Sequence, residues 1–541
     1  MEDDIPGNAQ RPRSTTSASS NKERKLKWYE YLGRGMYMDV KSRLPYYVSD
    51  WTDAWNYRVV PATLVIFFAN VLPGLAFSLD LIESTGEYGV QEVLLSTFMA
   101  AFVAAVFGGQ PLLISGVTGP ITVFNKTIYD IFVKNGSGGE GFNYHQFIGW
   151  VYLWGAILHW IAAFTNVRRA SHNATVQPSQ HTSAFLGIIL ALITLVLPHL
   201  FNMFYHSPFS HRHVRRFCAD YGMPITIVAV SGLAYWGRFN TYVHVPDMRL
   251  PTNAAFQPAG GREWLVRFWN LPGKYVGIAF PFGFVLFILF YFDANVSSLI
   301  AQGSEFPLRK PPGFHWDFFL LGITTFIAGL LGVPAPNGLI PQAPMHTAAL
   351  VVMGRDKKDE ETVVEGDGAL RREEKQDRQQ EEVKEVPVAV VEQRVSNLVQ
   401  GSICLVLMTG PFQTVLGQIP KGVLAGLFCY MGSDAIFSSQ ITTIFLFLIK
   451  DRHLTSPTDP LHQVRKSRLC MWMFIQLLGF AATFAITNTI AAIGFPVVIA
   501  LLIPFRVLII PKLSFFSPEE LAILDGPVAS PFTMASVGGS I

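Results

Sequence analysis

The chain has 541 residues, of which 50% are hydrophobic and only 15% are charged, and its mean hydropathy is +0.32. Soluble globular domains carry about 25% charged residues, so this composition excludes an ordinary soluble protein and indicates a polytopic membrane protein. The net charge of +2 gives no reason to expect a nucleic acid as a partner.

Residues 1–27 are polar, serine-rich and basic. Such a composition predicts a disordered tail, and its lysines and arginines place it on the cytoplasmic side of the membrane. Beyond it we expect a first-repeat and central transmembrane region (28–352), a charged cytoplasmic loop (353–398), a C-terminal transmembrane region (399–511) and a cytoplasmic C-terminal tail (512–541).

Apolar segments recur along most of the chain. A helix of about 20 residues crosses the roughly 30 Å of hydrocarbon in a bilayer, and with two interrupted segments the count of spans reaches about thirteen. The uninterrupted candidates are residues 59–79, 90–107, 147–164, 183–205, 222–236, 275–292, 318–333, 399–416, 420–437, 469–486 and 490–509.

The two interrupted segments read "PLLISGVTGPITVFNKTIYDIF" (111–132) and "GVPAPNGLIPQAPMHTAALVVM" (332–353). Neither can be one continuous helix, because each proline removes a backbone donor and clashes with the preceding turn. Irregular backbone at membrane depth survives only where protein buries it or where it lines a watery cavity. Two such segments in corresponding halves point to a transporter site between inverted repeats; the alternative is two kinked structural spans.

Each interrupted segment is expected to run extended to mid-membrane and then begin a half-helix. The first half-helix should start near Thr118, Gly119 and Pro120, and the second near residues 341–346. Two positive helix ends that face one site suit a small anion. Asp293, at the end of a long apolar run, is the third element, because an ionisable residue inside a membrane is a functional candidate by default. Alternatively, Asp293 lies at an interface and caps its span.

The charged stretch within 353–398 has few aromatic residues, so we interpret it as a solvated linker, with regulation by a partner or by modification as the alternative. Residues 440–452 are interpreted as an interfacial helix, and Ser517 and Pro518 as a helix start. The sequence contains no His-Glu-x-x-His pair, phosphate-binding loop or Gly-x-Ser-x-Gly elbow. We therefore expect no enzyme and no cofactor, and transport driven by gradients.

Several longer motifs carry a resemblance to a known family: "GGQPLLISGVTGPITVF", "FDANVSSLIAQ", "KPPGFHWDFFLLG", "PNGLIPQAPMHTAAL", "GLFCYMGSDAIF" and "FPVVIALLIPFRVLIIP". Together they resemble the bicarbonate and borate transporter family, and specifically its fungal borate exporters, over residues 28–525. The resemblance implies an all-α membrane fold of fourteen segments in two inverted repeats of seven. It also implies a core domain that moves against a gate domain in an elevator-like manner, and a homodimer joined through the gates.

The resemblance places the substrate site between the two half-helices and beside Asp293. Animal anion exchangers have an arginine where this chain has Gln342, which weakens the case for chloride/bicarbonate exchange. Gln342 and Thr118 suit borate or boric acid, whose hydroxyls donate and accept hydrogen bonds, and Asp293 is expected to gate transport or couple it to protons or another ion. The residues that the resemblance assigns to the site are Thr118, Gly119, Pro120, Ile121, Asp293, Gln342, Ala343, His346 and Thr347.

The resemblance also reveals a departure, because the segment after Asn166 runs straight into the span that begins at Ser183, and the family's fifth span is missing. With thirteen alternating spans, the basic loops at 212–216, 309–310 and 450–468 fall outside the cell; one further span moves all three inside, as the charge rule requires. A skipped exon or wrong gene model explains the gap, and a divergent form is the alternative.

The sequence therefore predicts an exporter of borate or boric acid in the plasma membrane, with the vacuolar membrane as the alternative location. A second hypothesis is an exchanger of bicarbonate or another inorganic anion on the same fold. A third is a non-transporting scaffold or inactive family member, which the missing span would favour.

Overall fold

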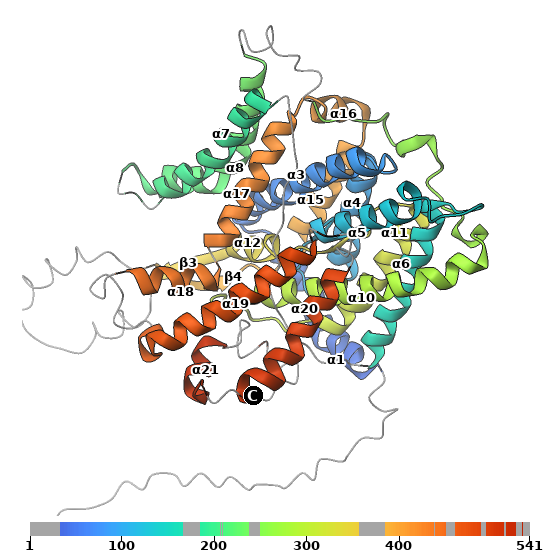
Figure 1. Cartoon of the computed structure of the whole chain (residues 1–541). Coiled ribbons are helices and arrows are strands. Elements are labelled where there is room, and N and C mark those ends of the chain that lie inside the picture. Colours follow the sequence, from blue (N-terminus) through green and yellow to red (C-terminus); the bar gives the residue numbers. More distant parts are fainter. Residues whose placement is uncertain are drawn as a thin grey trace, which may run out of the picture.

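The computed structural model describes residues 33–165, 184–205, 207, 209–236, 249–355, 385–437, 439–450, 460–487, 489, 494–512, 515–525 and 533. Within these residues the fold is almost entirely helical, which confirms an all-α polytopic membrane protein (Figure 1). Seven of the described helices are long and apolar enough to cross a membrane, or up to nine spans if two bent helix pairs each count as one. The seven are α3 (Val59–Thr85), α4 (Val90–Phe107), α6 (Tyr144–Thr165), α7 (Ala184–Tyr205), α10 (Gly273–Ala301), α11 (Phe314–Leu331) and α19 (Lys466–Thr487).

One set of helices packs around the centre of the molecule, and we call it the core group. Small residues let its backbones approach closely, as is usual in membranes. A Cβ added at Gly329 of α11 would lie 3.1 Å from the Cβ of Tyr152, and one at Gly155 of α6 would lie 3.0 Å from Leu286. The group consists of α3, α4, α5 (Gly119–Tyr129), α6, α10, α11, α12 (Gln342–Ala349) and α15 (Val395–Leu407).

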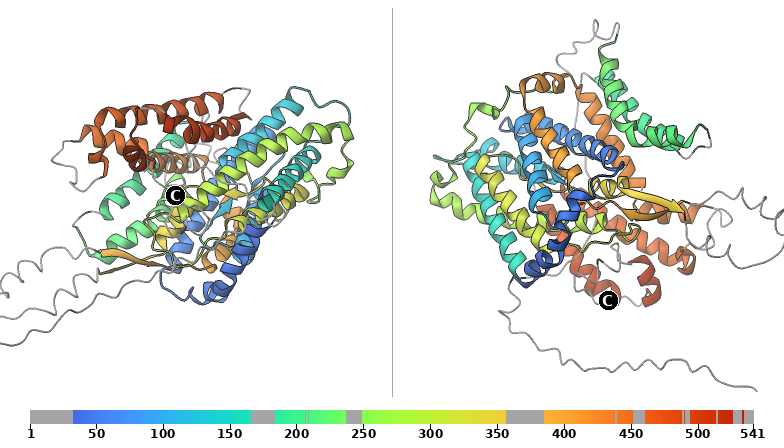
Figure 2. Two further views of the ribbon diagram at one scale, coloured as in Figure 1. Left: turned by 90° about the horizontal axis from the view of Figure 1, so that it is seen from below. Right: turned by 180° about the vertical axis from the view of Figure 1, so that it is seen from behind.

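A second set, the gate group, consists of α7, α8 (Arg212–Ala234) and α17 (Lys421–Phe437), with α7 and α8 projecting at the edge of the molecule (Figures 1 and 2). His199 on α7 hydrogen-bonds Ser433 on α17 at 2.8 Å. The gate group meets the core group along α3, where apolar side chains of both groups form one buried cluster. Helix α3 therefore forms much of the boundary between the two groups.

Extended backbone lies at the centre of the core group. Strands β1 (Ser115–Gly116) and β2 (Asn337–Gly338) pair antiparallel, and each precedes a half-helix, α5 and α12 respectively. The interrupted segments are thus broken as the sequence predicts. A second antiparallel pair, β3 (Val351–Arg355) and β4 (Glu385–Val390), lies between α12 and α15.

The C-terminal part departs from the predicted spans in two places. The predicted span 399–416 is not one continuous helix, because α15 ends at Leu407 and α16 (Gly410–Leu416) is bent by 93° relative to it. Thr409 is extended before Pro411, which lacks a backbone donor and cannot continue the helix. Within the span predicted for 490–509, the regular helix α20 covers Phe495–Pro504, and a π-helical turn follows at Phe505–Ile509.

The remaining elements surround these groups. The helix predicted after Ser517 is present as α21 (Pro518–Leu524), with a capping box between Ser517 and Glu520, and the short helix predicted for 440–452 is α18 (Gln440–Ile449). The N-terminal helices are α1 (Arg34–Arg43) and α2 (Tyr47–Thr52). Short 3₁₀ or π segments lie at Leu44–Tyr46, Asp130–Lys134, Ala259–Gly261, Phe268–Asn270, Pro460–Gln463 and Ile510–Lys512.

Three predicted features lie wholly or partly outside the described residues. They are the basic tail (1–27), the position of the missing span between Asn166 and Ser183, and the middle of the charged loop (356–384). The ends of that loop are described, as β3, β4 and the start of α15 at Val395.

Candidate functional site

The pairing of β1 with β2 brings the two broken segments together. Ser115 faces Gly338 and Gly116 faces Asn337, and the backbone nitrogen of Leu339 donates to the oxygen of Ile114 at 2.9 Å. A Cβ at Gly116 would lie only 2.6 Å from Oδ1 of Asn70 on α3. The bridge is therefore held tightly against α3, and a Cβ at position 116 would force the Asn70 amide, which is hydrogen-bonded to Gln400, to move.

The first half-helix begins where the sequence predicts. Thr118 is the N-cap of α5 in extended conformation, and Pro120 follows at an early helical position, where its missing donor is harmless. Oγ1 of Thr118 is buried, and within the described residues it has neither a cap hydrogen bond nor another partner. The first backbone donors of α5 are therefore not capped by this hydroxyl.

The second half-helix begins at Gln342, with Pro341 as its N-cap. Nε2 of Gln342 donates to the backbone oxygen of Ala69 on α3 at 3.1 Å. Its Oε1 is buried and has no hydrogen-bond partner among the described residues. Thr118 and Gln342 thus each leave one buried oxygen unsatisfied, and buried polar atoms of this kind are normally paired with protein, water or a ligand.

Asp293 is joined to the bridge through Asn337. The side chain of Asp293 is 4% exposed, and its Oδ2 accepts a hydrogen bond from Nδ2 of Asn337 at 3.1 Å. On the same helix, Oγ of Ser297 donates to the oxygen of Leu339 at 3.0 Å. Helix α10 continues to Ala301, so Asp293 lies within this helix and not at its end.

The other predicted site residues are occupied in packing. His346 contacts the oxygen of Leu112 through Nδ1 at 3.2 Å and Oγ of Ser396 through Nε2 at 2.6 Å. Oγ1 of Thr347 donates to the oxygen of Ala301 at 2.9 Å. Ala343 and Ile121 are fully buried, with Ile121 inside the main apolar cluster. These residues hold the half-helices in place, whereas Thr118 and Gln342 carry the unsatisfied atoms.

A chain of buried amides that the sequence analysis missed supports the bridge. Nδ2 of Asn70 donates to Oε1 of Gln400 at 3.1 Å, and Nε2 of Gln400 donates to Oδ1 of Asn397 at 3.0 Å. Asn397 in turn donates to the oxygen of Leu113, just before β1, at 3.1 Å. Polar residues inside apolar spans were the available signal, but two of these three hydrogen bonds join residues more than 280 positions apart.

No cation takes part in the hydrogen bonds that the structure describes for Thr118, Asp293 and Gln342. The positive potential at these groups comes from the N-termini of α5 and α12. At the start of α12 the backbone donor that is left is that of Gln342, because Pro341 and Pro344 have none and the nitrogen of Ala343 donates to the oxygen of Leu339 at 3.1 Å. A solute with both donors and acceptors would satisfy the free oxygens of Thr118 and Gln342 and the backbone donors together.

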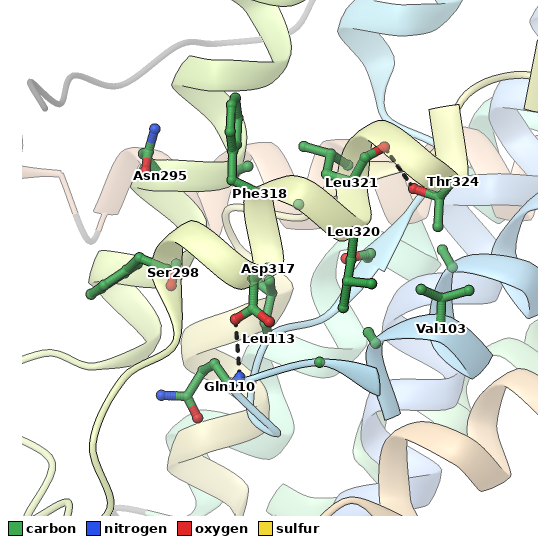
Figure 3. Close-up of a pocket in the computed structure, with 17 residues that line it drawn as sticks. Val103, Gln110, Leu113, Asn295, Ser298, Asp317, Phe318, Leu320, Leu321 and Thr324 are labelled. Atoms are coloured by element: carbon green, nitrogen blue, oxygen red, sulfur yellow. Dashed lines mark hydrogen bonds between the residues drawn. The ribbon is translucent and has the colours of Figure 1, made fainter. Parts of the chain in front are cut away.

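Two cavities adjoin the bridge and the half-helices. The first, of about 40 Å³, lies between α4, α10 and α11 and is lined in part by Ser115 and Gly338. Figure 3 shows Asp317 at this cavity, where its carboxylate accepts from the backbone nitrogen of Gln110 at 2.9 Å. The second cavity, of about 190 Å³, lies between the gate group and parts of α3 and α12, and is lined by Val65, Pro198, Phe201, Asn202, Ala219, Gly222, Met223, Pro224, Met345 and Tyr430.

Sequence comparison covers nearly the whole of this architecture. The family model described as "HCO3- transporter integral membrane domain" matches residues 31–175, 166–365 and 368–529. The chain belongs to this bicarbonate transporter family. Members of the family are transporters, and the helices and the two broken segments described above fall within the matched residues.

Individual relatives span almost all of the chain. A protein of Schizosaccharomyces pombe is 44% identical, over 93% of this chain and 98% of its own length. Boron transporter 1 of Saccharomyces cerevisiae is 38% identical, over 97% of this chain and 90% of its own length. The band 3 anion transport protein of Rattus norvegicus is 27% identical, over 91% of this chain and 55% of its own length.

Proposed function

We propose that this protein exports borate or boric acid across the plasma membrane. The observation that carries the proposal is the pair of half-helix N-termini at which Thr118 and Gln342 leave buried oxygens unpaired, on the two segments that the bridge joins, with Asp293 hydrogen-bonded to Asn337 of the bridge. The name of the S. cerevisiae relative, boron transporter 1, supports the choice of solute.

The chemistry of the site supports a hydroxylated solute. Each hydroxyl of boric acid or borate donates one hydrogen bond and accepts others. Such a solute would donate to Oε1 of Gln342 and Oγ1 of Thr118 while it accepts from the first backbone donors of α5 and from the backbone nitrogen of Gln342. A glutamine at position 342 supplies an acceptor, which a guanidinium in the same place would lack.

The arrangement of the two helix groups supports movement of the core group against the gate group. The cavity of about 190 Å³ lies between them, beside Val65 in the first turns of α3 and Met345 of α12. With the basic tail inside the cell, this part of α3 is its cytoplasmic half. We infer that the cavity is the cytoplasmic approach to the site, that the movement is elevator-like, and that the protein acts as a homodimer.

The proposal is tested by measuring intracellular boron in fungal cells that lack their own exporter, challenged with borate and expressing this chain with surface delivery verified. Wild-type protein should lower intracellular boron. Thr118→Val should abolish the effect, whereas Thr127→Val on the same helix should retain it, because the Thr127 hydroxyl already donates to the oxygen of Val123. Equal boron in cells with wild-type protein and with empty vector contradicts the proposal.

Asp293 is proposed to gate transport or to couple it to protons. Asp293→Asn keeps an acceptor for Asn337 but removes the ionisable group, so it should abolish the dependence of flux on pH. If Asp293→Asn kept the pH dependence of the wild type, Asp293 would not couple transport to protons, and the proposal of boron export would still stand.

The second candidate is an exchanger of bicarbonate or another inorganic anion, which the family description and the relative named as an anion transport protein favour. Chloride-dependent bicarbonate flux in reconstituted vesicles, without boron export in cells, would select it. The glutamine at position 342, where the resemblance places an arginine in animal anion exchangers, favours boric acid or borate over chloride/bicarbonate exchange.

We also propose that this chain lacks the fifth span of the family. The alignment with the S. pombe relative runs over 532 positions but covers only 93% of the 541 residues, so the relative carries residues at positions where this chain has a gap. If delivered protein moves no tested anion, insertion of one span after Asn166 should restore boron export. Failure of the restored chain as well would favour a non-transporting scaffold.

A further inference from the structure

The chain contains the acceptor pattern for N-linked glycosylation, Asn-x-Ser/Thr, at four asparagines: Asn125, Asn135, Asn173 and Asn295. Asn173 lies outside the described residues. Asn125 is fully buried on α5 and Asn295 is 9% exposed on α10. Asn135 is therefore the exposed acceptor within the part of the chain that the structure describes.

The backbone presents Asn135 at a turn. The π-helical segment Asp130–Lys134 ends at this residue, whose backbone nitrogen donates to the oxygen of Asp130 at 2.9 Å. Gly136 has a φ of +70°, and a Cβ added there would meet no atom within 4 Å. Ser137 is exposed as well. The three residues of the acceptor pattern thus stand in open space at the end of a helix, where a transferring enzyme can reach the amide.

Contacts place Asn135 at the end of the core group that carries the α3–α4 turn. The ring of Tyr88 in that turn lies 6.0 Å from the ring of Tyr144, which begins α6 just after the Asn135 loop. The opposite end of α4 is where the N-terminal helices dock, since the hydroxyl of Tyr47 donates to the oxygen of Val106 at 3.1 Å. Asn135 and the N-terminal helices therefore lie at opposite ends of α4.

The distribution of charge identifies the side of the membrane. The tail 1–27, which leads into the N-terminal helices, contains six lysines and arginines, and the segment 356–384, which joins β3 to β4, contains seven beside eleven acidic residues. At the end with Asn135, residues 86–89 of the α3–α4 turn and the loop 135–143 contain no lysine or arginine, whereas the loop 249–272 that packs on this turn contains three, Arg249, Arg262 and Arg267. The N-terminal end therefore has the larger number of lysines and arginines. Because cytoplasmic segments are enriched in these residues, the end with Asn135 faces away from the cytoplasm.

We propose that Asn135 is an N-glycosylation site, modified on the lumenal side of the secretory pathway. In the reaction, Nδ2 of Asn135 forms a bond to the anomeric carbon of an oligosaccharide carried on a lipid diphosphate. The bond between that carbon and the diphosphate oxygen breaks, the lipid diphosphate leaves, and a base of the transferring enzyme takes the amide proton. The hydroxyl of Ser137 is required by the pattern.

The experiment uses the full chain expressed in a eukaryotic host and treated with peptide N-glycosidase before electrophoresis. Wild-type protein should gain mobility equivalent to one glycan. Asn135→Gln and Ser137→Ala should migrate from the start like the treated wild type, whereas Ser137→Thr should keep the glycan because it keeps the hydroxyl. Asn173→Gln is the matched control and should leave the shift unchanged.

Two results would overturn the proposal. The first is delivered wild-type protein whose mobility does not change on treatment. The second is a shift that persists in Asn135→Gln and disappears in Asn173→Gln, which would also reverse the sidedness argued from charge. The readout does not depend on transport, so it stands apart from the proposed boron export.

Discussion

Asp50 is the residue whose replacement we expect to destabilise the protein most. It lies on α2 and is fully buried, and its carboxylate pairs with three cations: Arg43 at 2.8 Å, Lys310 at 2.8 Å and Arg394 at 2.9 Å. These partners come from α1, from the loop before α11 and from the residue that precedes α15. Asp50 therefore joins segments that are distant in the sequence.

The expected magnitude follows from burial. Asp50→Asn preserves shape but leaves three cations with one acidic partner fewer, and the side chains of Arg43 and Arg394 are only 4% and 1% exposed. Loss of one partner from a buried ion pair costs about 3–5 kcal/mol, because the other charge stays buried and unpaired. The Glu83–Lys421 pair is the matched control: it is 2.6 Å long but 58% and 35% exposed, and exposed pairs contribute roughly 0–1 kcal/mol.

The assay is the temperature at which half of the detergent-solubilised protein stays monodisperse. Asp50→Asn should lower that temperature far more than Glu83→Gln. Adding Arg43→Met to Asp50→Asn should recover part of the loss, because Asp50 is the acidic side chain that pairs with Arg43 among the described residues and the double variant removes the cation left unpaired. Equal midpoints for Asp50→Asn and Glu83→Gln would refute the reasoning that burial gives the cluster its energy.

Three further predictions concern the bridge, the half-helix and the α3–α4 turn. Gly116→Ala should abolish transport because its Cβ would lie 2.6 Å from the amide oxygen of an α3 asparagine, whereas Gly277→Ala, with no atom within 4 Å, should leave flux unchanged. Tyr152→Phe removes a hydroxyl that pairs a buried asparagine of α5 and a backbone donor near β2, so thermal stability should fall by about 1–3 kcal/mol. The imidazole of His145, whose Nε2 lies 3.1 Å from a carboxylate oxygen of Glu87, lowers the pKa of Glu87. The stabilisation from this contact is therefore present above the ordinary carboxyl pKa and is lost as the pH falls through the lowered value. Melting curves of Glu87→Gln should lack this acid-dependent component.

Local chemistry explains which features the sequence could predict. The starts of both half-helices follow from prolines and glycines whose effect acts within a few residues, and the structure begins α5 at Gly119 and α12 at Gln342. The break at Thr409 carries the same kind of signal, a Gly-Pro pair, yet the apolar run around it favoured one span. A proline alone does not predict a break, since Pro73 of α3 and Pro281 of α10 lie in continuous helices. In a membrane, neighbouring groups can satisfy the backbone groups that a proline leaves free.

The partners of the site residues could not be predicted in the same way. Asn337 lies 44 residues from Asp293, and Gln400 lies 330 residues from Asn70. Such pairs depend on how the two halves of the chain pack, and a single sequence does not show which distant residues come into contact. The sequence could identify polar groups that need a partner in the membrane, but only the pairing of β1 with β2 determines which partner each one meets.

The charges at the site connect the choice of solute with the choice of coupling ion. Each half-helix N-terminus acts as roughly half a positive charge, so the two together offset one ionised carboxylate at Asp293. A site that is neutral in this way favours neutral boric acid, whereas protonation of Asp293 would leave it positive and favour the borate anion. Borate bound together with a proton and boric acid bound alone both have a net charge of zero, so the two modes of transport move the same charge across the membrane. Asp293→Asn fixes the site in its positive form, and the proposal therefore expects that variant to be inhibited by small anions that leave the wild type unaffected.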